Sequence, residues 1–297
     1  MHILITGGSG LIGSSLIPSL KPSSITVLTR SVSSTERVLG NTVKFLSSLE
    51  GLPNLDEFDV VLNLAGEGII DKSWSVAQKQ ILQNSRWALT AKLVELIKSG
   101  ETPPACFISG SAIGYYGRQS DTIIDESFDH CQNDFSHQLC ERWEQLALQA
   151  ASPKTRVCIL RTGIVLTKRG GALPKMLLPF KLGLGGPIGD GKQYMSWIHL
   201  QDMLGGISHL IDNKDCRGVY NFTAPVPVTN QAFSVALAST LHRRCFIRTP
   251  AFILRMLMGE RADLILYGQR VIPKRLMESG FEFIYPQIKP ALVSLNL

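Results

Sequence analysis

The chain has 297 residues, of which 44% are hydrophobic and 18% charged, and its formal net charge is +6. This length and composition can bury a sizeable core, as one large α/β domain or as a nucleotide-binding domain with a smaller lobe. The sequence has no basic run and no stretch of about 20 apolar residues, which argues against a nucleic-acid partner and a membrane anchor. Its six cysteines form no Cys-x-x-Cys pair, as is typical of reduced thiols. We therefore expect a cytoplasmic monomer or homodimer that binds a small molecule, without a nucleic-acid or membrane partner.

Short apolar runs alternate with longer helical patterns in the first part of the chain. Runs of four or five apolar residues are too short for helices and suit strands that are buried on both faces. The predicted strands are residues 3–6, 25–29, 60–64, 106–109 and 156–160. The predicted helices are residues 11–20, 75–99 and 135–151. This alternation predicts an α/β fold, a Rossmann-type doubly wound parallel sheet with a smaller C-terminal substrate lobe.

The pattern changes after Leu166, where glycines punctuate the chain as far as Gly191. Such a segment predicts little regular structure, and we assign it to the substrate side. Helices are expected again at residues 232–241 and 252–258, followed by an irregular tail from Ile272. We therefore divide the chain into a dinucleotide-binding core, residues 1–166, and residues 167–297. The second part forms mainly the substrate lobe and a C-terminal extension, with some segments that return to the core.

The first predicted strand runs directly into a glycine-rich turn that a helix follows, which is the context of a dinucleotide-binding fingerprint. Glycine dihedrals close such a turn, the missing Cβ atoms leave room for a pyrophosphate, and the helix N-terminus supplies unpaired N–H groups. The alternative is a turn whose glycines are purely structural. The residues expected at the cofactor here are Gly7, Gly8, Gly10, Leu11, Ile12 and Gly13.

The second predicted strand ends in Thr29-Arg30, where sheets that prefer NAD usually carry an acidic residue for the ribose 2′-hydroxyl. Arg30 can instead form a charge-assisted contact with a 2′-phosphate, and Thr29 can donate its hydroxyl beside it. These residues favour NADP(H) over NAD(H). Alternatively, Arg30 lies in solvent at the end of the strand, which leaves the preference undetermined.

Other residues are expected at the carboxyl ends of the strands, where ligands bind in doubly wound sheets. Small residues after the strand at 60–64 allow the backbone to approach the cofactor, and the residues after the strand at 156–160 are placed to border the nicotinamide. Arg86 either reaches a cofactor phosphate or is an exposed structural arginine. The further cofactor residues are Leu64, Ala65, Gly66, Arg86 and Val165. The expected substrate residues are Glu67, Tyr115, Arg161 and His199, although Glu67 is equally suited to a surface role.

With these motifs the chain resembles the extended short-chain dehydrogenases/reductases, a group that includes nucleotide-sugar epimerases. The segment Ser109-Gly110-Ser111-Ala112-Ile113-Gly114-Tyr115-Tyr116-Gly117 is similar to the active-site strand end of that group. Trp197-Ile198-His199 and Ile272-Pro273-Lys274-Arg275 resemble epimerase-family proteins sometimes labelled cell-division inhibitor homologues. The resemblance covers nearly the whole chain. It implies the same fold and an oxidoreductase or epimerase that acts on a carbonyl or sugar-type substrate.

The chain departs from the group's catalytic pattern of a Ser or Thr and a Tyr-x-x-x-Lys pair, in which the lysine assists proton transfer by the tyrosine. Ser111 fits the first position, although alignment on Tyr116 places Ala112 there. The expected Tyr is Ser136 and the expected Lys is Cys140. A serine hydroxyl is a far weaker acid than a phenol with a pKa of about 10, and a neutral thiol gives no electrostatic help.

The candidate catalytic residues are therefore Ser111, Tyr116, Ser136 and Cys140. Tyr115, Tyr116, His137 or His199 could replace the missing acid, but packing or hydrogen-bonded support explains each of them equally well. No cluster of residues has the spacing of a metal site. Three interpretations stay open: an NADP-dependent oxidoreductase or epimerase with a different proton relay, an NADP(H) sensor without turnover, and a structural or cell-division partner.

Overall fold

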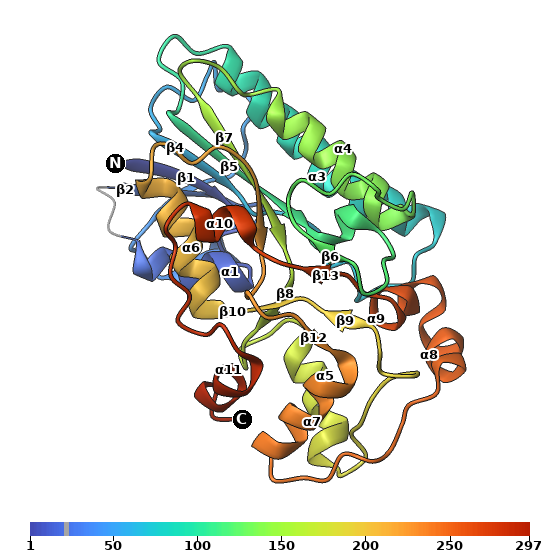
Figure 1. Ribbon diagram of the computed structural model, residues 1–297. Helices are drawn as coiled ribbons and strands as arrows, with labels where there is room; N and C mark the ends of the chain where they lie inside the picture. The colour runs from blue at the N-terminus through green and yellow to red at the C-terminus, as the bar shows by residue number, and fades with distance from the viewer. Residues whose placement is uncertain (21–23) are drawn as a thin grey trace.

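The computed structural model describes residues 1–20 and 24–297. A parallel seven-stranded sheet lies at its centre, in the order β11-β7-β5-β4-β1-β2-β3 (Figure 1). The strands are β1 (His2–Thr6), β2 (Ser24–Leu28), β3 (Lys44–Leu46), β4 (Val60–Asn63), β5 (Cys106–Ala112), β7 (Arg156–Thr162) and β11 (Gly218–Phe222). The chain moves from β1 to β2 and β3 on one side, then returns to add β4 on the other. This topology confirms the predicted doubly wound parallel sheet, with its switch point between β1 and β4.

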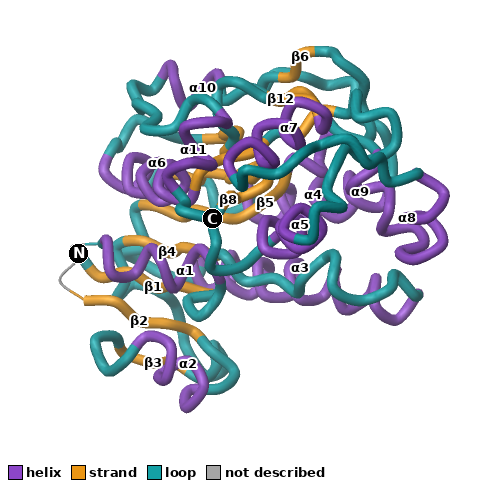
Figure 2. Tube along the Cα trace, turned by 90° about the horizontal axis from the view of Figure 1, so that it is seen from below, coloured by secondary structure: helices purple, strands orange, loops and turns teal. Residues whose placement is uncertain are grey.

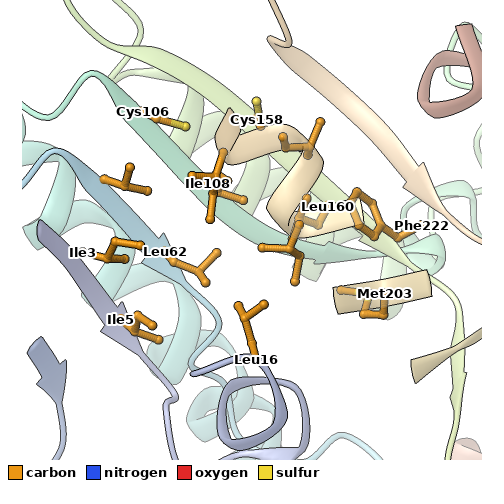
Figure 3. Close-up of a cluster of buried hydrophobic side chains, with 14 of the residues drawn as sticks. Ile3, Ile5, Leu16, Leu62, Cys106, Ile108, Cys158, Leu160, Met203 and Phe222 are labelled. Carbon is orange, nitrogen blue, oxygen red and sulfur yellow. The ribbon is translucent and has the colours of Figure 1, made fainter. Parts of the chain in front are cut away.

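Two apolar layers cover the sheet, because successive side chains of a strand point to opposite faces. Ile3 and Ile5 belong to a cluster with α1 and α6, which Figure 3 shows, whereas Leu4 belongs to a cluster with α3 and α4. The helices around the sheet are α1 (Leu11–Leu16) with the 3₁₀ turn η1 (Ile17–Ser19), α2 (Val32–Leu39), α3 (Val76–Lys98), α4 (Phe135–Leu148) and α6 (Leu200–Asp212). Burial of each aliphatic side chain in these layers contributes about 1.5–3 kcal/mol.

The C-terminal lobe packs around a third apolar cluster that includes Trp197 and Phe233. Its helices are α5 (Ala172–Lys181), α7 (Asn230–Thr240), α8 (Ala251–Met258), α9 (Asp263–Leu266), α10 (Lys274–Glu278) and α11 (Ile288–Ser294), with the 3₁₀ turn η3 (Gly259–Ala262). Two short strand pairs join the lobe to the core, β8 (Ile164–Leu166) with β10 (Trp197–His199) and β6 (Ile123–Ile124) with β13 (Arg270–Val271). A third pair, β9 (Tyr194–Met195) with β12 (Val228–Thr229), lies within the second part of the chain. Figure 2 shows α5, α7 and α11 of the lobe on the side of β5 and β8, away from β2 and β3.

The structure has regular elements that the sequence pattern did not predict. Helix α5 lies in the glycine-punctuated segment, where Gly171 caps the helix with a φ of +72°. Helix α11 lies in the tail expected to be irregular and buries Ile288 and Leu292 against the third cluster. Both helices are short, and short helices gain their stability from tertiary packing rather than from local propensity.

Part of the second half of the chain returns to the core. Strand β11 pairs with β7 at the edge of the sheet, and α6 packs on the same face as α1. Among the described residues, no helix combines the length and apolar character required to cross a bilayer. The same part of the chain contains no group of three His, Cys, Asp or Glu residues that could hold a metal ion.

Candidate cofactor and active site

The glycine-rich turn leaves the carboxyl end of β1 and leads into α1. Gly7 has a φ of +71°, and a Cβ on it would lie 2.8 Å from the backbone of Leu64. A Cβ on Gly13 would lie 2.5 Å from the Gly7 carbonyl oxygen, and one on Gly8 would lie 2.7 Å from Val27 Cγ1. The packing of the turn against β2, the end of β4 and α1 therefore requires these three glycines.

Gly10 differs from the other glycines of the turn because it is exposed to solvent. A Cβ on Gly10 would have the Gly7 carbonyl oxygen, at 3.1 Å, as its one neighbour within 4 Å. Gly10 also caps α1, and no side chain accepts from the first N–H groups of this helix. The N–H groups of Leu11 and Ile12 have no acceptor within the helix itself. Protein packing thus restricts Gly10 less than it restricts Gly7, Gly8 and Gly13, and the approach of a pyrophosphate would restrict it further.

The end of β2 places Arg30 at the surface next to α2. The Thr29 hydroxyl lies 2.7 Å from the hydroxyl of Thr35 in α2, so it is already held within the protein. Across the switch point, Glu67 pairs with Lys72 at 2.9 Å. Lys72 is the main cause of the lowered pKa of Glu67, with smaller contributions from Arg30 and Arg86. Lys72, Arg30 and Arg86 therefore attract the Glu67 carboxylate electrostatically at the carboxyl ends of β2 and β4.

Arg86 extends from α3 beneath the loop that follows β4. Its guanidinium donates to the carbonyl oxygens of Glu67, at 2.9 Å, and Leu82, at 3.1 Å, and lies 5.3 Å from the ring centre of Trp143. A Cβ on Gly66 would lie 3.0 Å from the Arg86 guanidinium carbon. Arg86 thus holds the Leu64-Ala65-Gly66 loop in place from below, and burial lowers its pKa. A direct contact with a cofactor phosphate stays a prediction.

The structure brings together the four residues proposed for catalysis, where α4 packs against β5 and the 3₁₀ turn η2 (Ile113–Tyr116). A Cβ on Gly114 would lie 3.2 Å from Ser136 Cβ and 3.8 Å from Cys140 Sγ. Ser136 and Cys140 are buried. Burial is the main cause that raises the pKa of the Cys140 thiol to about 12, so it is neutral at physiological pH.

Glu144, which is not among the predicted site residues, lies at the centre of this cluster. Its carboxylate accepts from Arg161 Nε at 2.9 Å and Nη2 at 2.8 Å, and from the Ser111 hydroxyl at 2.6 Å. Glu144 and Arg161 are both 4% exposed. A sequence signal for Glu144 exists, because Ser136, Cys140 and Glu144 are four residues apart and share one face of α4.

The same network extends across the sheet to β11. Arg161 Nη1 donates to the Tyr116 hydroxyl at 3.0 Å, and this hydroxyl donates to Asn221 Oδ1 at 2.8 Å. Tyr116 is 0% exposed, and burial raises its pKa to about 12. Ser111 and Tyr116 thus belong to one buried hydrogen-bonded network that also contains Glu144, Arg161 and Asn221.

Tyr115 is the partly exposed phenol of the cluster. The Arg161 guanidinium carbon lies 3.4 Å from the centre of the Tyr115 ring, and the His137 ring lies edge-on at 5.3 Å. His137 Nδ1 also lies at hydrogen-bond distance from the Tyr115 carbonyl oxygen. Burial is the main cause of the raised pKa of Tyr115, and Arg161 opposes it.

The remaining predicted residues are more scattered. His199 accepts from the Gln201 N–H at the start of α6, and its ring lies 4.1 Å from that of Tyr285. Burial lowers the pKa of His199 to about 4. Its contacts are those of a support residue between α6 and the C-terminal tail. Val165 lies in β8, near Gly170 and Gly171, whose Cβ positions are within 3.3 Å of the Leu11 side chain.

Comparison with known proteins agrees with this architecture. Residues 3–222 match the NAD dependent epimerase/dehydratase family, and residues 249–295 match a domain of unknown function, DUF1731. An epimerase family protein of Staphylococcus saprophyticus is 36% identical over 296 residues, with 99% of each chain covered.

Solved structures show the same relationship. The crystal structure of the human epimerase family protein SDR39U1 (isoform 2) with NADPH has a TM-score of 0.90 and 32% identity, and the match covers 100% of this chain and 99% of the human one. UDP-glucuronic acid 4-epimerase from Bacillus cereus, in complex with UDP-glucuronic acid and NAD, shares the fold at a TM-score of 0.79 and 18% identity, over 100% of this chain and 98% of that one. Together with the matched residues, these similarities confirm the predicted family resemblance. The chain belongs to the NAD dependent epimerase/dehydratase family and ends in a DUF1731 segment.

Proposed function

We propose that the chain binds NADP(H) at the carboxyl ends of β1, β2 and β4, in preference to NAD(H). Gly10 supports a pyrophosphate at the start of α1, because it is exposed at the turn and a side chain there would occupy space that the pyrophosphate needs. Arg30 supports the 2′-phosphate, since it is an exposed cation at the end of β2 where an acidic residue would repel that group. The human relative with 32% identity was crystallised with NADPH, which agrees with this choice.

We further propose that the protein is an oxidoreductase or epimerase for a carbonyl or sugar-type substrate, with Tyr115 as its proton donor. The observation that supports this role is the contact of Arg161 with the partly exposed Tyr115 ring, whose centre lies 3.4 Å from the guanidinium carbon. A bound nicotinamide would supply or accept the hydride. Tyr115 holds a proton on its hydroxyl at neutral pH, since the ordinary pKa of a phenol is about 10 and burial raises it further. Arg161 stabilises the negative charge that develops when this proton leaves.

Arg161 thereby takes the electrostatic role of the missing lysine. Glu144 fixes the guanidinium through two hydrogen bonds, and the hydroxyl of Tyr116 fixes its remaining end. Ser111 contributes indirectly, since it donates to Glu144. The buried network thus supports an arginine that cannot rotate away from the Tyr115 ring.

Two measurements test this proposal. Titration calorimetry is expected to show NADPH binding at least about tenfold tighter than NADH, as a charge-assisted hydrogen bond implies. NADPH absorbance, followed across carbonyl compounds, quinones and nucleotide sugars, is expected to reveal turnover that is strongly reduced in Tyr115→Phe. Equal affinities for the two cofactors contradict the first part, and turnover that Tyr115→Phe leaves unchanged contradicts the second.

The second candidate function is an NADP(H) sensor without turnover. It is favoured by the protonation state of the cluster, since Ser111 and Tyr116 donate their protons to buried acceptors and the Cys140 thiol is neutral. Tight NADPH binding without oxidation by any substrate of the panel would favour this function over the enzyme.

A further inference from the structure

The C-terminal lobe exposes an apolar and basic surface that the proposed function does not use. Residues 186–189, in the loop that follows α5, lie next to the segment that connects α7 to α8. The Gly189 N–H donates to the Thr249 carbonyl oxygen at 2.9 Å. The Thr249 N–H donates to the Pro187 carbonyl oxygen, also at 2.9 Å. In Figure 1 the connecting segment runs along the lower edge of the molecule as far as α8. We call residues 242–257 the basic-apolar face.

Large apolar side chains protrude from this face. Phe246 and Phe252 are each 68% exposed, and Met256 is 75% exposed. Helix α8 has no buried residue, so it contributes little to the core of the lobe. Soluble proteins seldom leave contiguous apolar groups in water unless they contact a partner or a membrane.

The charges on this face have one sign. Exposed arginines at positions 243, 244 and 248 alternate with the apolar side chains. The sequence has no Asp or Glu between Asp215 and Glu260, and none between Glu144 and Asp190. Of the carboxylates at its borders, Glu260 pairs with Lys79 at 2.7 Å, and Asp190 accepts from the Lys192 N–H at 2.9 Å. The face therefore presents positive charge around its apolar groups.

This charge pattern selects among the possible occupants. A second copy that docked by two-fold symmetry would bring two surfaces of the same positive charge together, which is repulsive. An anionic membrane surface fits both components, since its headgroups attract arginines while its acyl boundary accepts aromatic and aliphatic side chains. We propose that the basic-apolar face docks on anionic membrane surfaces. This contact is peripheral and independent of the proposed cofactor, and it revises our expectation of a protein without a membrane partner.

Vesicle co-sedimentation of the full chain tests the proposal. Vesicles of phosphatidylcholine with about 30 mol% phosphatidylserine are expected to retain the protein, and about 0.5 M NaCl is expected to release most of it. Vesicles of phosphatidylcholine alone are expected to retain at least about tenfold less protein.

Two double variants separate the components of the face. Phe246→Ser/Phe252→Ser removes apolar groups, and Arg243→Glu/Arg244→Glu reverses charge; each is expected to weaken vesicle binding by about tenfold or more. Val76→Ser, at a residue that is 90% exposed on α3, and Lys44→Glu/Lys98→Glu are the matched controls and are expected to bind normally. Circular dichroism and thermal unfolding verify that each variant is folded.

Several results would overturn the proposal. These are a failure of the wild-type chain to bind anionic vesicles, and vesicle binding that neither double variant weakens. If the chain does not bind vesicles but dimerises with increasing concentration, and Phe246→Ser/Phe252→Ser abolishes the dimer, the face is assigned to a second copy instead. Binding to soluble polyglutamate as strong as binding to vesicles assigns it to an acidic protein.

Discussion

Glu144 and Arg161 form a two-point ion pair beneath the end of β5, with distances of 2.9 and 2.8 Å between their hydrogen-bonded atoms. Because both side chains are buried, Glu144→Gln leaves an arginine whose charge is no longer neutralised. We expect this variant to lower the free energy of unfolding by about 3–5 kcal/mol. Replacement of both residues, as Glu144→Leu/Arg161→Met, is expected to cost less than the sum of Glu144→Leu alone and Arg161→Met alone, which complete the cycle. Urea unfolding of the four proteins in a double-mutant cycle measures the coupling, and additive effects would contradict it.

Arg30→Ala is expected to weaken NADPH binding by about 1.5–3 kcal/mol and to leave NADH binding unchanged, because only NADPH carries the 2′-phosphate. Arg37→Ala is the matched control, since Arg37 is also exposed and lies on the adjacent helix α2. Titration calorimetry with both cofactors gives the affinities. An equal loss for NADH and NADPH would show that Arg30 acts on the shared part of the cofactor or on the fold.

Two glycines of the turn are expected to respond differently to substitution. Gly10→Val is expected to abolish NADPH binding with a modest loss of stability, because its side chain would point into the space that the pyrophosphate needs. Gly13→Ala is expected to destabilise the fold itself, since the new Cβ would lie 2.5 Å from the Gly7 carbonyl oxygen. Thermal unfolding without cofactor, combined with calorimetry, separates the two effects. Normal NADPH binding by Gly10→Val would place the cofactor elsewhere.

Tyr115→Phe is expected to reduce turnover about hundredfold or more and to leave NADPH affinity unchanged, because it removes the proposed proton donor and keeps the ring on Arg161. Tyr116→Phe and Ser111→Ala are also expected to reduce turnover, through the network that holds Arg161. Single-turnover oxidation of NADPH compares the three variants at equal cofactor occupancy. A smaller effect of Tyr115→Phe than of Tyr116→Phe would transfer the donor role to Tyr116.

The stability of the fold is expected to decrease as the pH falls from about 6.5 towards 4, partly through His199. Burial lowers the pKa of this residue in the folded state to about 4, below its ordinary value. The unfolded chain therefore takes up a proton in this range before the folded chain does, which favours unfolding by up to about 3 kcal/mol. His199→Asn keeps an acceptor for the Gln201 N–H and removes the titration. Urea unfolding at pH 7 and pH 5 is expected to show a smaller loss for this variant, and an identical loss would contradict the assignment.

The sequence predicted features that depend on neighbouring residues. The apolar runs that became β1, β4 and β5 are unambiguous because strands buried on both faces are almost entirely apolar. The glycine-rich turn was also predictable, since its backbone conformation requires glycine at Gly7. Residues 21–23, which follow the helix predicted to end at Leu20, lie outside the described part of the chain.

Features that depend on distant contacts were not predictable. The role of Glu144 requires α4 to lie against β7, where Arg161 is placed, and this proximity follows from the topology alone. Strand β11 contains Gly218 and Asn221, which weaken its strand pattern, and it forms because β7 offers a free edge. His199 resembles an active-site residue in sequence but lies between α6 and the C-terminal tail.

The return of residues 200–222 to the central sheet has a consequence for synthesis of the protein. Strand β11 closes the edge of β7, and α6 covers the apolar face that β7 shares with β5. While the ribosome makes the chain, this face and this edge stay uncovered until residue 222 has emerged. The nucleotide-binding half cannot complete its folding before residues 200–222 exist. Over that interval the nascent chain exposes apolar surface and an unpaired strand edge, which chaperones can bind.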